Sequence, residues 1–170
     1  MTRGDFIYKW FWFAVATLPI WLLEDVVFSH ISPFGVRPML LPLAAVAVAV
    51  LEGSVGGAGY GMAIGLLCYA CWPQASPVII PGLVAAGILI GIATRYGLKQ
   101  SFISYFLCGT ALLAVNDLVR ILLGLLRHQA PLLVLMKTSA AEILVSLLFA
   151  PLIWVLLHKV FDRVGGTRLM

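Results

Sequence analysis

The chain has 170 residues, of which 62% are hydrophobic and 11% are charged, whereas about 25% of the residues in an ordinary soluble domain are charged. This composition excludes a water-soluble globular protein, and we expect residues 1–170 to form a single integral membrane domain. The net charge of +4 does not indicate nucleic-acid binding, because the basic residues are scattered singly between apolar runs and form no basic patch.

The apolar runs predict about six membrane-spanning helices, since each crossing of a bilayer takes about 20 mainly apolar residues. In chain order they cover residues 8–28, 38–51, 55–72, 78–94, 102–126 and 132–157, with Thr138 as an alternative start of the last one. The second run covers only about 21 Å of a core roughly 30 Å thick. It is therefore kinked, recessed or re-entrant, and if it is re-entrant the count falls to five. A tight turn at Glu52-Gly53-Ser54 leads into the third run.

These runs predict an all-α fold, a polytopic helical bundle in the membrane. Lipid offers no water to an open sheet edge, and no run shows the alternating pattern of a barrel strand. The distribution of basic residues then predicts the orientation, because cytoplasmic segments carry the excess of lysine and arginine. One side has Arg3, Lys9, Arg95, Lys99, Lys159, Arg163 and Arg168, and the other has Arg37, Arg127 and Lys137. Both termini are therefore expected in the cytoplasm.

Glycines recur at helical spacing in the third and fourth runs. Gly57, Gly61 and Gly65 are four residues apart, and Gly87 and Gly91 repeat the spacing. Small residues at this spacing let a second helix approach closely, whereas a phosphate-binding loop needs a different pattern followed by lysine and serine or threonine. We expect these glycines to pack against a helix of the same chain or of a partner.

No pattern in the sequence indicates catalysis, a cofactor or a metal. Cys68 and Cys71 have the C-x-x-C spacing of zinc and redox sites, but further ligands are scarce and packing is the favoured interpretation. No nucleophile has an adjacent base, and no carboxylate pair has a catalytic separation. We therefore expect a protein that is not an enzyme.

A few ionisable residues lie within the apolar runs, where an unpaired charge is costly. Asp117 and Arg120 are three residues apart and Asn116 and Arg120 are four apart, so the three share a helix face. The other acidic residues are expected at the same depth, near the outer surface. The predicted intramembrane polar cluster comprises Glu24, Asp25, Asn116, Asp117, Arg120 and Glu142. Two interpretations stay open: an ion-pair network that braces the helices, and a cavity or partner site.

Several short motifs occur in a distinctive order. They are Arg37-Pro38, Leu40-Leu41-Pro42, Glu52-Gly53, Gly65-Leu66-Leu67 and a final run with Pro151 followed by basic residues. In this order they resemble the bacterial rod shape-determining protein MreD family over most of the chain from Arg37 onward. One difference is that the family commonly has an acidic residue shortly after the Gly-Leu-Leu, where this chain has Cys68-Tyr69-Ala70-Cys71.

The resemblance implies a non-enzymatic component of the cell-elongation machinery in the bacterial cytoplasmic membrane. Such proteins scaffold or regulate peptidoglycan synthesis by contact with the bitopic membrane protein MreC, and indirectly with MreB, RodA and the transpeptidase of RodA. A homodimer is a possible further assembly. On this interpretation the glycines pack helices, and the polar cluster supports the bundle or meets a partner.

The alternative is the substrate-capturing membrane subunit of an energy-coupling-factor-type vitamin transporter. Such subunits are of similar size, have six helices and bind their ligand near the outer surface. They tend to carry an Ala-x-x-x-Ala motif in the first helix, whereas Ala14 and Ala16 here are followed four residues later by Leu18 and Ile20.

Overall fold

The computed structural model describes residues 3–30, 37–71, 78–97, 100–126 and 132–164, and within these ranges all regular structure is helical. The elements are α1 (Arg3–Leu22), the π-helical turn η1 (Leu23–Val27), α2 (Phe28–His30), α3 (Leu40–Cys71), α4 (Ile79–Tyr96), α5 (Phe102–Leu126) and α6 (Leu132–Arg163). In the described part of the chain, five helical stretches are long and apolar enough to cross a membrane: Ile7–Val27, Leu40–Cys71, Ile79–Tyr96, Phe102–Leu125 and Met136–Arg163. The chain is thus a multi-pass helical membrane protein.

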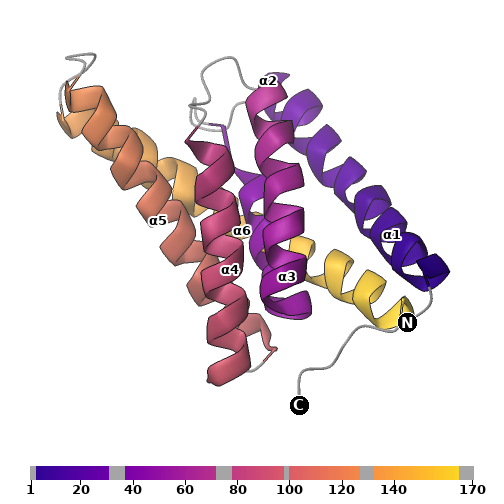
Figure 1. Cartoon of the computed structure of the whole chain (residues 1–170). Helices are drawn as coiled ribbons and strands as arrows, with labels where there is room; N and C mark the ends of the chain where they lie inside the picture. Colours follow the sequence, from indigo (N-terminus) through magenta and orange to yellow (C-terminus); the bar gives the residue numbers. More distant parts are fainter. Residues whose placement is uncertain (1–2, 31–36, 72–77, 98–99, 127–131, 165–170) are drawn as a thin grey trace.

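Helices α3 and α4 lie side by side at the centre of the bundle (Figure 1). Helix α1 covers one side, α5 lies on the other, and α6 crosses behind them (Figure 1). Both α1 and α6 contain an internal proline, Pro19 and Pro151. Helix α6 extends past the predicted end at residue 157 to Arg163. Lys99, Arg127 and Arg168, which enter the predicted orientation, lie outside the described residues.

Helix α3 contains both the second and the third predicted span, and the chain reverses between them. Gly53 has φ 81° and ψ −167°, a conformation that is essentially confined to glycine. A Cβ atom on Gly57 would lie 2.9 Å from the Cα of Ala49, although eight residues of unbroken helix would separate the two by about 12 Å. Residues 40–52, the first arm, therefore pack against residues 54–71, the second arm. The bounds of the arms follow the predicted runs 38–51 and 55–72 closely.

The first arm forms the centre of the protein core. Every residue from Leu40 to Leu51 is buried, and Ala44, Ala47, Val48, Ala49 and Val50 are each 0% exposed. At 1.5 Å per residue this arm is about 20 Å long, too short for the roughly 30 Å hydrocarbon core. A break in a helix at membrane depth is tolerated where protein surrounds it. The burial of the arm therefore explains how its short length is accommodated.

The glycines of the two predicted stripes face each other across α3 and α4. A Cβ on Gly87 would lie 2.4 Å from the carbonyl oxygen of Gly57, and a Cβ on Gly61 would lie 2.6 Å from that of Leu83. Gly91 approaches the backbone at the start of the second arm even more closely. The partner of these glycines is thus a helix of the same chain, and contact is possible only because they lack side chains.

Helix α1 is connected to the second arm through polar side chains. The hydroxyl groups of Thr17 and Tyr60 are hydrogen-bonded to each other, and Trp21 Nε1 donates to Cys71 Sγ at 3.3 Å. Lys9, which the orientation argument treats as a flanking charge, lies inside α1 and is 5% exposed. Its ammonium forms an ion pair with Glu52 at the end of the first arm, because a buried lysine needs an anionic partner.

Candidate functional site

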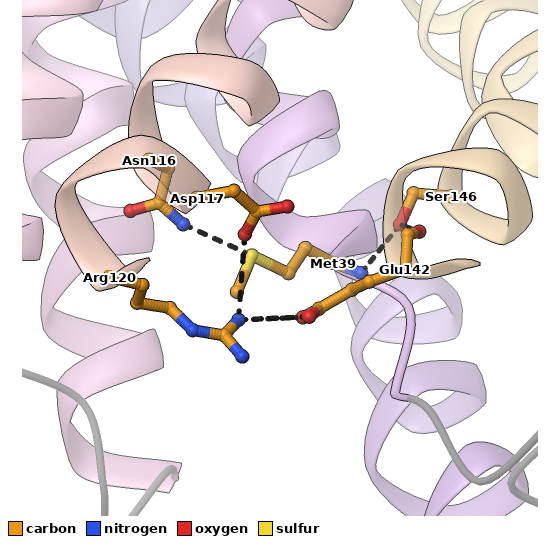
Figure 2. Close-up of polar contacts among 6 residues, drawn as sticks. All are labelled: Met39, Asn116, Asp117, Arg120, Glu142 and Ser146. Atoms are coloured by element: carbon orange, nitrogen blue, oxygen red, sulfur yellow. Dashed lines mark hydrogen bonds and ion pairs between the residues drawn. The ribbon is translucent and has the colours of Figure 1, made fainter. Parts of the chain in front are cut away.

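The polar residues predicted on α5 and α6 meet between these two helices. Arg120 Nη1 donates to both carboxylate oxygens of Glu142, at 3.0 and 2.9 Å, and lies 3.6 Å from Asp117 Oδ1 (Figure 2). Asp117 and Arg120 are one helical turn apart on α5, which gives the predicted shared face. Glu142 comes from the first half of α6. These residues form a three-member ion-pair cluster, here called the Arg120 cluster.

The Arg120 cluster contains two carboxylates and one guanidinium, and their exposures differ. The side chains of Asp117 and Glu142 are 6% and 8% exposed, whereas that of Arg120 is 51% exposed. The Ser139 side chain also faces Asp117. The guanidinium thus covers the carboxylates from the outside of the bundle and presents its other side outward, as long cationic side chains do near membrane interfaces.

Two further side chains connect the Arg120 cluster to the start of α3. Asn116 Nδ2 donates to Met39 Sδ at 3.2 Å, and the backbone N–H of Met39 donates to Ser146 Oγ at 2.9 Å (Figure 2). Ser146 in turn donates to the carbonyl oxygen of Glu142 at 2.7 Å. The segment that leads into the buried first arm is therefore held by polar groups from both α5 and α6.

Glu24 has a separate role from the one that the sequence suggested. Glu24 Oε2 accepts a hydrogen bond of 2.8 Å from the backbone N–H of Leu41, and the residue is 5% exposed. The first N–H groups of a helix have no partner within it, and a carboxylate there also suits the helix dipole. The wider π-helical turn η1 carries Glu24. Asp25, half-buried beside it, does not join the ion pairs of Arg120.

The structure therefore brings together four of the six predicted polar residues: Asn116, Asp117, Arg120 and Glu142. Glu24 caps the first arm instead of joining the ion pairs of Arg120, although it lies close enough to Glu142 to interact with it electrostatically. Glu24 and the residues around the Arg120 cluster thus hold the same segment, Met39 to Leu41, from different helices.

Sequence reasoning missed the polar groups at the other end of the first arm. Gln100 Nε2 donates to the carbonyl oxygen of Leu51 at 2.8 Å, and Lys9 pairs with Glu52. A lysine and a glutamate inside or beside apolar runs were the available signal, but nothing in their sequence separation indicated that they meet. Side chains from other segments thus cap both ends of the first arm.

The described residues contain no group of three or more histidine, cysteine, aspartate or glutamate side chains placed to hold a metal ion. Cys68 is buried, and Cys71 is the acceptor for Trp21. The groups that the structure does bring together, carboxylates with a guanidinium, are suited to holding helices and to binding charged or hydrogen-bonding partners.

We compared the chain with protein-family models, with curated proteins and with solved structures. No family model matches, no curated protein matches, and no solved structure matches.

Proposed function

We propose that the chain is a non-enzymatic membrane component of the bacterial cell-elongation machinery, of the MreD type. It scaffolds or regulates peptidoglycan synthesis in the cytoplasmic membrane by contact with MreC, and through MreC with MreB, RodA and its transpeptidase. The proposal rests first on the order of short motifs from Arg37 to Pro151.

One structural observation carries the proposal further: the motif residues lie at both ends of the buried first arm. Leu41 donates its N–H to Glu24, and Glu52-Gly53 makes the reversal that requires a glycine. Of these motif positions, Gly53 is one at which the fold depends on the particular residue, whereas any residue except proline supplies the N–H at position 41.

The acidic residue expected after Gly65-Leu66-Leu67 has a counterpart on another element. Glu24 lies close enough to Cys68 to interact with it electrostatically. An acidic group thus lies in the same region of the fold as the position at which the family commonly has one. We infer that Glu24 of η1 replaces that acidic residue.

The proposed topology has six crossings with both termini in the cytoplasm, the two arms of α3 counting separately. Support comes from the reversal at Gly53, because two arms that each cross would make the number of crossings even. The excess of lysine and arginine in the segments on the side of the termini supports the orientation.

The test combines co-purification with complementation of cell shape. The tagged chain is co-expressed with MreC of the same organism and purified in mild detergent, with an unrelated bitopic protein as the control. In parallel, the chain is expressed in rod-shaped bacteria that lack their MreD and have become spherical. We expect selective retention of MreC and a return to rods. Retention no greater than that of the control, together with cells that stay spherical, refutes the proposal.

One observation favours the vitamin-transporter subunit as a second candidate. The Arg120 cluster has one carboxylate more than it has cations, so a cationic ligand would balance its charge. A thermal-shift screen of the purified chain with vitamins tests this function. A saturable thermal shift that is lost in Asp117→Asn and kept in Asp162→Asn would favour the transporter function. A screen in which no vitamin shifts the melting temperature excludes it.

A further inference from the structure

A large apolar groove lies between α1 and the second arm of α3, away from the Arg120 cluster. Its volume is about 990 Å³. Helix α1 lines one wall with aromatic and aliphatic side chains, among them Trp10, Phe11 and Trp21, and the second arm lines the other with Gly56, Gly59 and Ala63. The lining residues of the second arm run from Val55 to Leu67, which corresponds to about 18 Å of helix.

The wall formed by the second arm is recessed because its residues are small. Apart from its chain neighbours and the nearby backbone of its own helix, no atom lies within 4 Å of the position that a Cβ on Gly59 would occupy. Gly57 and Gly61, on the opposite face of the same arm, are in direct contact with α4. The second arm thus has two faces of small residues at helical spacing, one filled by α4 and one open. Small residues on an open face allow the backbone of another helix to approach closely.

A second and independent feature of the groove is a buried carboxylate oxygen without a partner. Glu52 lines the groove with a side chain that is 6% exposed. Its Oε2 pairs with Lys9, but its Oε1 has no hydrogen-bond donor among the described residues. A buried acceptor without a donor lowers the stability of the fold by about 1 to 3 kcal/mol. A lipid tail carries no donor, whereas a polypeptide helix with serine, threonine, asparagine, lysine or arginine at this level supplies one.

We propose that this groove binds the transmembrane helix of a single-pass partner protein. The partner backbone packs against Gly59 and Ala63, and a donor side chain of the partner reaches Glu52 Oε1. The aromatic side chains of α1 close the other side. The inference rests on the proposed function, in which this partner is MreC, and it assigns the surface that the partner uses.

The test is cysteine cross-linking between the chain and MreC in membranes. Cys68, Cys71 and Cys108 are replaced by alanine, and this background is used once it retains MreC as the wild type does. Gly59→Cys and Ala63→Cys are then each combined with single cysteines along the MreC transmembrane helix. Ala85→Cys on α4 is the matched control. Gly57 opposes Gly87 and Gly61 opposes Leu83, so residue 85 lies at the same depth as residue 59. Ala85 is also exposed.

We expect disulfides from positions 59 and 63 to MreC residues spaced three or four apart, and none from position 85. Gly59→Leu should reduce retention of MreC by about tenfold, which corresponds to about 1.4 kcal/mol, while Ala85→Leu leaves it unchanged. A monodisperse elution profile shows that each variant is folded, and the cysteine variants test the groove even where leucine is not tolerated.

Other outcomes overturn the inference in distinguishable ways. Cross-links from position 85 but not from 59 or 63 place MreC on another face and leave the proposed function intact. Disulfides between two chains at position 59 assign the groove to a second copy. Phospholipid that is retained by the wild type and lost on Gly59→Leu, with MreC retained by both, assigns the groove to lipid. Absence of MreC from the purified wild type refutes the proposed function together with the inference.

Discussion

The contact between Gly57 and Gly87 gives a prediction whose magnitude follows from the structure. In Gly87→Ala the new methyl group would lie 2.4 Å from the carbonyl oxygen of Gly57 and 2.6 Å from its carbonyl carbon, whereas ordinary contacts are 3.4 to 4 Å. Because both obstructing atoms belong to the backbone, α4 and the second arm must separate by about 1 Å. Overpacking costs about 1 to 3 kcal/mol, and the higher helix propensity of alanine returns at most about 1 kcal/mol. We expect a net loss of about 1 to 2 kcal/mol.

Gly82→Ala on the same helix is the matched control, since nothing lies within 4 Å of a Cβ there. This variant gains helix propensity without a clash, so its free energy of unfolding should equal or exceed that of the wild type. The free energy is measured by titration with sodium dodecyl sulfate in mixed micelles, followed by far-UV circular dichroism. If Gly87→Ala proves as stable as Gly82→Ala, the close packing of α3 on α4 is wrong.

Three further predictions concern the ends of the first arm and the Arg120 cluster, and the same titration measures all of them. Gly53→Ala should lower the free energy of unfolding by about 1 to 3 kcal/mol, because φ of 81° with ψ of −167° is strained for alanine. An unchanged midpoint of the titration would contradict the reversal. Glu24→Leu should lose about 1 to 3 kcal/mol by leaving the Leu41 N–H without an acceptor, and Glu24→Gln should lose less; equal losses would exclude the capping role. Arg120→Met should lower the free energy of unfolding by about 2 kcal/mol, which is less than for a fully buried pair because Arg120 is half-exposed. Adding Glu142→Leu to this variant should recover part of the loss. Additive losses would show that the two residues are not coupled.

The helices and most of their bounds could be predicted from the sequence. The predicted run 102–126 coincides with α5, and the run 78–94 differs from α4 by two residues or fewer at each end. Composition is sufficient here because a bilayer selects apolar segments by length, and their backbone hydrogen bonds are satisfied within each segment. The tight turn at Gly53 was also visible, since Glu52-Gly53-Ser54 interrupts two apolar runs.

The candidate site was predictable only where its residues share a helix. The i, i+3 and i, i+4 spacing placed Asn116, Asp117 and Arg120 on one face, and the structure has them there. The contribution of Glu24 to α3 was not predictable in this way, because it depends on how η1 meets the start of the first arm.

The sequence by itself determined the solvent, the class of fold and the small-residue faces, because these follow from hydropathy and from the periodicity within a helix. Only the tertiary structure decided that the first arm is enclosed, that Lys9 meets Glu52 and that one small-residue face of the second arm is filled while the other is open. Each of these depends on which helices are neighbours. The physical reason is that lipid is as apolar as the helix surfaces, so hydropathy alone does not distinguish a face that meets lipid from one that meets another helix.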